Sequence, residues 1–415
     1  MQLHRNSRKS TGDRTTKRAA LAGVVALALL LAACTGPASE SPSGPASEST
    51  SEPTSEPTSE PTPSGESSPD GEPPSAPILP DGELLAAAPA DLVIGMAVAG
   101  GGHHLDTPLG TGTPLADETY SQLLAANFSS VTPENQLKWE WVHPERDRYD
   151  FGVADEIVEF AEANGQVVRG HALLWHSQNP DWLTAEDFSD DELREVLRDH
   201  ITTVVGRYAG RIAQWDVANE IFGDDARLRT QENPFLARFG IEIVADAFRW
   251  AHEADPDALL FLNDYAIESA GPKADLYLAL AEELLADGVP LHGMGFQGHL
   301  SMQYPKPAGM AENFERFAAL GLEVAVTEAD VRMSVDGDGV ASAGDLAVQA
   351  DYFRSMVDAC LAVDTCRSFT VWGMSDAYSW VPFFFAGEGA ATLLDEEFGI
   401  KPAYTAVAEG LGAGR

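Results

Sequence analysis

Most of the short apolar runs in this chain are followed at once by side chains that can catalyse reactions or bind ligands. Glu220 follows the run Ile212–Val217, and Glu328 follows the run Glu323–Thr327. The other residues at such positions are amides, histidines, a lysine, a third glutamate and aromatic rings: Glu134, Asn135, Lys138, His171, Trp175, Gln178, Asn219, Tyr265, Gln297, His299, Trp372 and Trp380. One such residue could be structural, but a whole series of them indicates a functional site.

The pair Glu220 and Glu328 suits the cleavage of a glycosidic bond. One carboxyl group must protonate the departing oxygen, and the other must face the anomeric carbon. Tryptophan faces can stack on sugar rings, while amides, imidazoles and ammonium groups can reach sugar hydroxyls. The sequence has neither an HExxH zinc motif nor a GxSxG nucleophile elbow. We therefore predict carboxylate chemistry without a cofactor.

Metal binding is not indicated by the spacing of the potential ligands. His103 and His104 are adjacent, but no third ligand stands at a helpful spacing in the sequence. We therefore interpret both as surface histidines and predict no metal site. Asp330, two residues after Glu328, is expected to support Glu328 or His299 rather than to act as a catalytic acid.

The elements that must position these residues alternate between strand and helix. Short apolar runs predict parallel strands, and longer amphipathic stretches predict helices. The strand candidates are 92–96, 129–132, 167–172, 212–217, 259–262, 293–296, 323–327 and 368–372, with helices such as 153–163, 191–208, 241–253, 274–285, 314–319 and 347–359 between them.

This alternation predicts an α/β fold, a (β/α)8 TIM barrel, in which the carboxyl ends of the strands converge on one mouth. The alternative is a doubly wound open sheet. Gly100-Gly101-Gly102 follows the first strand but lacks the GxGxxG spacing of a phosphate loop, which weakens that alternative.

Six segments, in order along the chain, resemble the signature segments of glycoside hydrolase family 10. They are Val131-Thr-Pro-Glu-Asn-Gln-Leu-Lys-Trp139, Gly170-His-Ala-Leu-Leu-Trp-His-Ser-Gln178, Trp215-Asp-Val-Ala-Asn-Glu220, Asn263-Asp-Tyr265, Gly295-Phe-Gln-Gly-His299 and Thr327-Glu-Ala-Asp330. The resemblance implies a (β/α)8 barrel and a retaining endo-1,4-β-xylanase, with xylan and xylo-oligosaccharides as ligands.

The resemblance also implies roles for the residues at the strand ends. Glu220 matches the general acid/base, Glu328 the nucleophile, and Asn219 the group that holds the sugar 2-hydroxyl. Gln297 and His299 would orient the nucleophile, and Tyr265 would lie on the leaving-group side. Glu134, Asn135, Lys138, His171, Trp175 and Gln178 would line the non-reducing side, and Trp372 and Trp380 would cover the site.

Some positions depart from the family pattern or are settled only by resemblance. Ala218, Ile221 and Ala329 exchange one apolar residue for another, which predicts local repacking and not lost chemistry. The segment 222–233 could reshape the leaving-group side. Family members pair the cysteines that match Cys360 and Cys366, and two free buried thiols are the alternative.

The first 33 residues resemble a bacterial lipoprotein signal peptide. Arginines and lysines precede an apolar stretch, 19–33, which is too short for a comfortable membrane span and ends Leu31-Ala32-Ala33-Cys34. We expect Cys34 to carry lipid and to place the protein on the extracellular side of a membrane. An ordinary signal peptide cut near Ala33 is the alternative.

The segment 34–80 is rich in Ser, Pro, Glu and Thr and repeats Ser-Glu-Pro-Thr. Such a composition cannot bury enough apolar surface to fold, so we predict a disordered linker. The catalytic domain is then expected to span 81–415. The charge of the chain is strongly acidic, with 65 acidic and 26 basic residues and a net charge of −39. This charge argues against nucleic-acid binding, and we expect a monomer.

Two other functions remain open. The same machinery could cleave another β-1,4-linked glycan, such as a β-glucan, if its pocket near Lys138 and Trp380 admits the hydroxymethyl group that xylose lacks. The chain could also be a surface lipoprotein that binds glycans with a silent site. Release of reducing ends distinguishes catalysis from binding.

Overall fold

The computed structural model describes residues 79–414, so the predicted signal peptide, Cys34 and nearly all of the linker lie outside the described residues. Ten strands are present in this part of the chain. They are β1 (Val93–Val98), β2 (Ser130–Pro133), β3 (Val167–Gly170), β4 (Gln214–Asn219), β5 (Leu259–Asp264), β6 (Gly293–Phe296), β7 (His299–Ser301), β8 (Glu323–Ser334), β9 (Cys366–Val371) and β10 (Glu388–Gly389).

Eight of these strands close into a parallel barrel. Each of β1 to β6 pairs with its sequence neighbour, β6 pairs with β8, β8 with β9, and β9 pairs back with β1. The prediction of a (β/α)8 barrel is therefore confirmed, and the open sheet is excluded because the β9–β1 pairing leaves no free edge between the first and last barrel strands.

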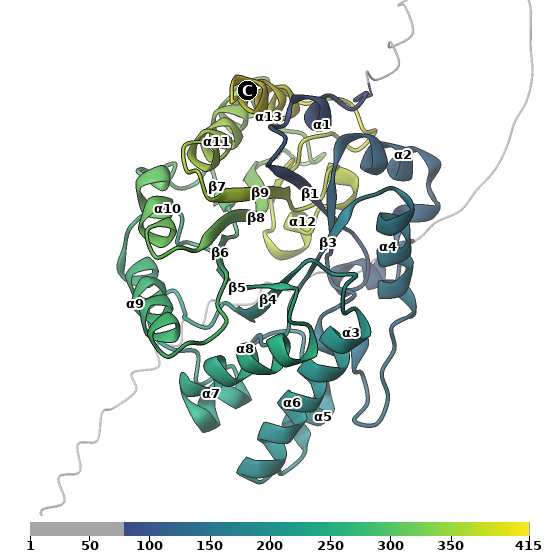
Figure 1. Ribbon diagram of the computed structural model, residues 1–415. Helices are drawn as coiled ribbons and strands as arrows, with labels where there is room; N and C mark the ends of the chain where they lie inside the picture. The colour runs from purple at the N-terminus through teal and green to yellow at the C-terminus, as the bar shows by residue number, and fades with distance from the viewer. Residues whose placement is uncertain (1–78, 415) are drawn as a thin grey trace, which may run out of the picture. The chain divides into compact units, whose positions relative to one another are not determined.

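Helices surround the strands (Figure 1). The principal helices are α2 (Glu118–Asn127), α4 (Gly152–Ala163), α6 (Asp190–Arg207), α8 (Glu242–Ala254), α9 (Pro272–Ala286), α10 (Met310–Ala318), α11 (Ala343–Leu361) and α13 (Pro402–Ala413). Shorter helices are α1 (Glu83–Ala87), α3 (Trp139–Val142), α5 (Asp181–Ala185), α7 (Pro234–Phe239), α12 (Val381–Phe384), η1 (Gly102–Asp106), η2 (Pro114–Ala116) and η3 (Asp376–Tyr378).

Capping residues explain where several helices begin. The Ser189 side chain accepts a hydrogen bond from the backbone N–H of Glu192, and the Glu192 carboxylate accepts one from the backbone N–H of Ser189. Helix α6 therefore begins with a capping box. Asp117 caps α2 and Ser342 caps α11, each through a single side chain. Helices α2 and α13 are not among the helices named from the sequence periodicity.

The barrel interior is filled by large side chains that face small ones. Trp215 of β4 is fully buried, and a Cβ placed on Gly170 of β3 would lie 2.2 Å from its ring. The guanidinium of buried Arg169 lies over the ring of Phe261 of β5, 4.5 Å from its centroid. The interior is therefore a packed core, and the open space lies at its mouth.

Strand β8 is longer than the sequence predicted. The apolar run ends at Thr327, yet the strand continues to Ser334 because two short strands pair with its extension. His299 of β7 lies opposite Asp330, and Glu388 of β10 lies opposite Ser334. Glu328 is therefore held within a continuous strand and does not stand in a loop after it.

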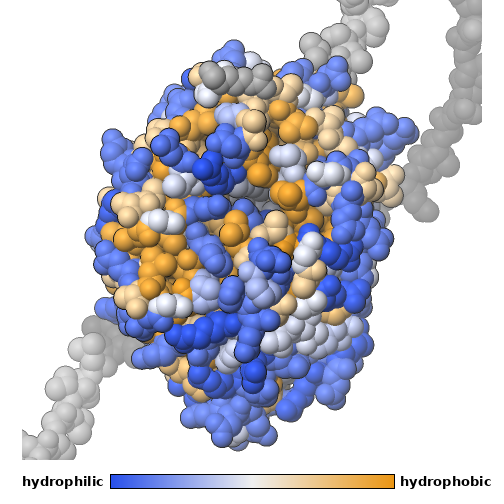
Figure 2. Space-filling model, viewed as in Figure 1, coloured by the Kyte–Doolittle hydropathy of each residue, from blue (hydrophilic) through white to orange (hydrophobic). Residues whose placement is uncertain are grey.

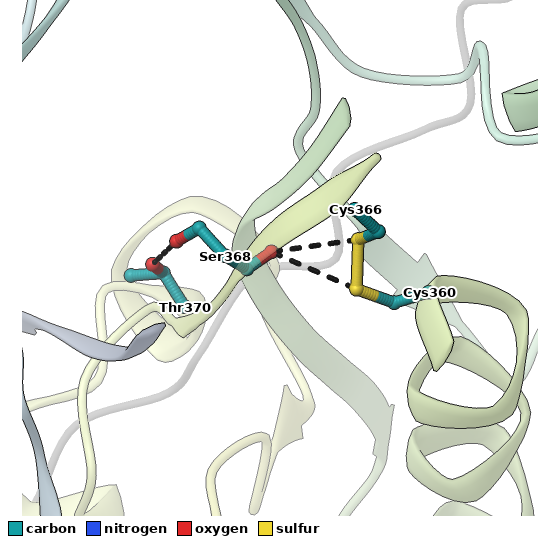
Figure 3. Close-up of a disulfide and its surroundings, with 4 residues drawn as sticks. All are labelled: Cys360, Cys366, Ser368 and Thr370. Atoms are coloured by element: carbon teal, nitrogen blue, oxygen red, sulfur yellow. Dashed lines mark hydrogen bonds between the residues drawn. A yellow bond between two sulfur atoms is a disulfide. The ribbon is translucent and has the colours of Figure 1, made fainter. Parts of the chain in front are cut away.

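Cys360 and Cys366 form a disulfide, as the family resemblance implied. It joins the last turn of α11 to the first residue of β9, with a Cα–Cα distance of 5.3 Å. Both sulfur atoms lie beside the carbonyl oxygen of Ser368 (Figure 3). The disulfide fixes the turn between a helix and a barrel strand, and the alternative of two free thiols is excluded.

Hydrophilic residues cover most of the periphery that the outer helices form, as expected from the acidic composition (Figure 2). Among residues 79–414, no helix combines the length and the apolar character that crossing a membrane requires.

Candidate active site

A cleft of about 910 Å³ lies at the carboxyl ends of the barrel strands. Most of the side chains predicted from the sequence line it: Glu134, Asn135, Lys138, Trp175, Gln178, Glu220, Tyr265, Gln297, His299, Glu328, Trp372 and Trp380. His171 and Asn219, which we also expected at the site, lie beneath this surface and are almost completely buried. The barrel thus gathers residues from the ends of most of its strands around one opening.

Glu328 is buried and held by three side chains. Asn263 donates to its Oε1 at 2.6 Å, and His299 Nε2 lies 3.2 Å from its Oε2. His171 Nδ1 lies 3.8 Å from Oε1. Thr327 donates to the amide oxygen of Asn263 at 2.7 Å, which turns the amide N–H₂ group toward Glu328.

This surrounding charge decides the ionisation of Glu328. Burial raises the pKa of its carboxyl group, but the attraction of His171 and the hydrogen bond from His299 outweigh burial and bring the pKa below its usual value. Glu328 is therefore ionised at neutral pH. An ionised carboxylate in a buried position is the form that a nucleophile needs.

The imidazole of His171 beneath Glu328 is itself held by a buried ion pair. His171 Nδ1 lies 3.0 Å from Asp216, and Arg169 donates to the same carboxylate through two nitrogens. Burial raises the pKa of Asp216, but Arg169 and His171 together lower it below its usual value. A buried row of polar contacts therefore runs from Arg169 through Asp216 and His171 to Glu328.

His299 lies between two carboxylates. Its Nε2 faces Glu328, and its Nδ1 lies 2.9 Å from Asp330 Oδ2. Burial alone would lower the pKa of His299, but Asp330 and Glu328 raise it to about 10. Trp380 donates to Asp330 at 2.7 Å, which links the cover of the cleft to this group. The expectation that Asp330 supports His299 is confirmed.

Glu220 stands at the other side of the cleft floor, directly after β4. Its backbone has a φ of 52°, a left-handed conformation that a non-glycine residue adopts at some cost. Gln297 donates to its Oε1 at 3.0 Å, and His176 Nδ1 lies 3.7 Å from its Oε2. We expected Gln297 to orient Glu328, but the hydrogen bonds of its amide go to Glu220 and Asn219.

Amides connect the two glutamates. Asn263 contacts both Glu328 and the side-chain amide of Asn219, the latter at 2.9 Å. The Asn219 amide in turn lies 3.4 Å from Oε1 of Glu220. Movement of either carboxylate would break this chain of contacts, so the pair is positioned as one unit.

One end of the cleft is a polar wall from the loops after β2 and β3. Asn135 accepts hydrogen bonds from Lys138 at 3.0 Å and from Gln178 at 3.1 Å. The ammonium of Lys138 also lies 4.7 Å from the centroid of the Trp175 ring. Donors and an aromatic face are therefore held together at this end, as sugar recognition requires.

The opposite end is built around Tyr265. Its hydroxyl donates to Asp224 at 2.7 Å and accepts from Arg229 at 2.8 Å. Asp224 and Arg229 both belong to the segment 222–233, so this segment shapes the cleft around Tyr265.

The sequence interpretation missed several residues that support the site. Asn263 belongs to the motif Asn263-Asp-Tyr265 but is not among the site residues that the sequence predicts, although it directly follows Leu262 at a strand end. Arg169 and Asp216 lie within apolar strand segments, where a charged residue is itself the signal for a buried ion pair.

The family model of glycosyl hydrolase family 10 matches residues 95–410, which spans nearly the whole barrel. The chain belongs to glycosyl hydrolase family 10. Membership makes it a glycoside hydrolase, and the resemblance of the six sequence segments is confirmed at the level of the family.

The chain is similar to several xylanases. It is 41% identical over 293 residues to endo-1,4-beta-xylanase B of Thermotoga neapolitana, and the match covers 70% of this chain and 83% of the relative. It is 39% identical over 300 residues to endo-1,4-beta-xylanase A of Phanerodontia chrysosporium, covering 72% of each.

The chain is also similar to solved structures of xylanases. Xylanase 10B of Thermotoga petrophila in complex with xylobiose superposes with a TM-score of 0.71 at 40% identity, covering 78% of this chain and 94% of that one. A mutant of xylanase10C of Cellvibrio japonicus in complex with xylopentaose gives a TM-score of 0.72 at 28% identity, and the match covers 80% of this chain and 69% of that one.

Replacing His299 with Asn should change the pH dependence of catalysis and of stability. Without this positive charge the pKa of Glu328 rises, so the acidic limb of the pH profile of kcat/KM should move to higher pH. A raised histidine pKa stabilises the folded state below about pH 6.5, and this contribution is lost as pH rises toward the folded-state pKa of about 10. The variant should therefore lose less stability than the wild type over that range.

Both effects can be measured in parallel, by initial rates across pH and by urea unfolding at acidic, neutral and alkaline pH. His252→Asn, on α8 and away from the cleft, is the matched control and should leave the acidic limb of the activity profile in place. An unchanged acidic limb in His299→Asn would show that His299 does not set the ionisation of Glu328.

Proposed function

We propose that this chain is a retaining endo-1,4-β-xylanase, with Glu328 as nucleophile and Glu220 as general acid/base. The observation that carries the proposal is the environment of Glu328, a buried carboxylate kept ionised by His171 and His299 and held by Asn263. Glu220 faces the same cleft and is more open to it, which suits a group that must exchange protons with a leaving group and with water.

In the first step, an Oε of Glu328 attacks the anomeric carbon while Glu220 gives its proton to the departing glycosidic oxygen. This forms a glycosyl ester on Glu328 and releases the leaving-group part of the chain. In the second step, ionised Glu220 takes a proton from water, and the water oxygen displaces Glu328. Two inversions give overall retention, which requires a separation of about 5–5.5 Å between the two carboxyl groups.

The imidazolium of His299 favours the first step because it keeps Glu328 ionised until attack. During attack Glu328 loses its charge, and the hydrogen bond from Asn263 restrains the carboxylate on the path toward the anomeric carbon. Asn219 contacts Glu220 directly and Glu328 through Asn263, so its amide can meet the 2-hydroxyl of the sugar bound to Glu328.

Xylan is the substrate that the comparisons support best. The relatives are named as endo-1,4-beta-xylanases, and two similar structures hold xylobiose or xylopentaose. In this chain Lys138, Trp175, Trp372 and Trp380 line the wall and cover near the cleavage point. A β-1,4-glucan would have to fit a hydroxymethyl group on every ring between these side chains. Parallel hydrolysis of xylan and carboxymethylcellulose tests this choice.

We also propose that the chain is secreted and tethered to a membrane through lipid on Cys34. The support is the basic and apolar leader that ends in Leu31-Ala32-Ala33-Cys34 and the linker that follows. The barrel would then work at a distance from the membrane, as a monomer, on polymer outside the cell.

Replacing Cys34 with Ser should release the enzyme from membranes. The wild type is expected to partition into detergent and the variant to remain in the aqueous phase, because a serine cannot take the lipid. Cell fractionation and detergent partitioning measure this, with xylanase activity as the readout. If the wild type is already in the medium and does not partition into detergent, the anchor proposal is wrong.

Replacing each glutamate with Ala should separate the two catalytic roles. Glu328→Ala should abolish turnover of every substrate. Glu220→Ala should lower the rate on xylan by on the order of 10²–10⁴, because protonation of a poor leaving group is lost. It should spare the first step on an aryl xylobioside, whose leaving group needs no proton, and azide should restore turnover of that substrate.

The products give the stereochemical test. Early products followed by NMR should be the β-anomer, and the azide product should be the β-glycosyl azide. Asp338→Ala, in an exposed turn, is the control and should retain normal rates. An initial α-anomer, or normal rates in Glu328→Ala, would contradict the assignment.

A further inference from the structure

The sequence predicts surface positions for His103 and His104, but in the structure both side chains are largely buried against Glu134. Helix η1 follows β1 and carries His103 and His104, while Glu134 directly follows β2. His104 Nε2 lies 3.2 Å from Glu134 Oε2, and His103 Nδ1 lies 3.7 Å from Glu134 Oε1. All three side chains are largely buried.

We propose that His103 Nδ1, His104 Nε2 and the carboxylate of Glu134 form a binding site for a divalent cation of the zinc class. Two imidazoles and a carboxylate are a ligand set that Zn²⁺ uses when it keeps a fourth position open. With metal–ligand distances of about 2.0–2.2 Å, neighbouring ligands of a tetrahedral ion lie about 3.3–3.5 Å apart. The distances of 3.2 and 3.7 Å bracket this range.

The geometry around His103 favours a missing ligand over a completed hydrogen-bond network. Its Nδ1 lies 3.7 Å from Glu134 Oε1, which is too far for a hydrogen bond. An imidazole nitrogen that faces a carboxylate without a hydrogen bond has a lone pair that can bind a cation placed between the two. A cation between His103, His104 and Glu134 would satisfy Nδ1 and the carboxylate at once.

The described residues contain a second group of potential metal ligands, namely His171, Asp216 and Glu328. This group differs from the first in the cations that already contact its carboxylates. Its carboxylates already have cationic partners in Arg169 and His299. In the first group Lys138 is the neighbouring cation, and its hydrogen bond goes to Asn135. The third potential ligand, Glu134, follows the next strand, so the spacing within the segment of His103 and His104 does not indicate it.

The fourth position of such an ion would open into the cleft, since His103 and Glu134 both line it. A consequence follows if the proposed function is right and Glu134 binds the non-reducing part of the substrate. The bound cation would then occupy Glu134 and compete with sugar, so it should raise KM and leave kcat unchanged.

Binding is tested first, without any substrate. Untagged full-length protein is freed of metal with EDTA, dialysed, and titrated with zinc chloride by calorimetry. Co²⁺ is the second probe, because a tetrahedral site with nitrogen and oxygen ligands gives a visible absorption band. We expect one equivalent bound, and at least about tenfold weaker binding in His103→Asn and in His104→Asn. Circular dichroism and thermal unfolding establish that each variant is folded.

His252→Asn is the matched control, because His252 lies on α8 beside His292 and should not contribute to the site. Failure of the wild type to bind Zn²⁺, or binding by both variants as tight as that of the wild type, would overturn the proposed site. Zinc that binds as expected but leaves the KM for xylo-oligosaccharides unchanged would keep the site and refute the competition. Absence of hydrolysis would count against the proposed function alone.

Discussion

The structure depends on keeping one carboxylate ionised in a buried position. Glu328 lies within a barrel strand and is almost completely buried, so an uncompensated charge there would be costly. Two imidazoles and an amide compensate it, and the imidazoles are in turn held by Asp216 and Asp330. Removing one partner of a buried ion pair typically costs about 3–5 kcal/mol. Replacing any one of the residues around Glu328 would therefore leave a buried charged or polar group of its neighbour without a partner.

The fold meets this requirement through strand pairing. The pairing of β7 with the extension of β8 places His299 opposite Asp330, and the barrel pairing of β5 with β6 and β6 with β8 brings Asn263 beside Glu328. Gly170 leaves room for the ring of Trp215 inside the barrel. The geometry of the candidate active site is thus set by backbone hydrogen bonds between barrel strands, while the ends of the cleft are formed by the loops after the strands.

Much of this was predictable from the sequence. All barrel strands were located, because apolar runs bounded by polar side chains mark buried parallel strands, and the side chains that follow them converge for topological reasons. The extension of β8 was not predictable, because it rests on pairing with His299–Ser301 and Glu388–Gly389, far away in the chain. The contact of Glu134 with His103 and His104 was not predictable for the same reason, because it joins segments that follow different strands. Spacing reveals ligands on one element, whereas these follow two neighbouring strands.

The most direct test of the account is to trap the proposed intermediate. A 2-deoxy-2-fluoro xylobioside with a good leaving group slows both steps but releases the covalent sugar more slowly than it forms, so the glycosyl ester accumulates. After inactivation and proteolysis, mass spectrometry should find the added sugar on the peptide that contains Glu328 and on no other carboxylate. A label on Glu220, or inactivation without any covalent label, would contradict the central role given to Glu328.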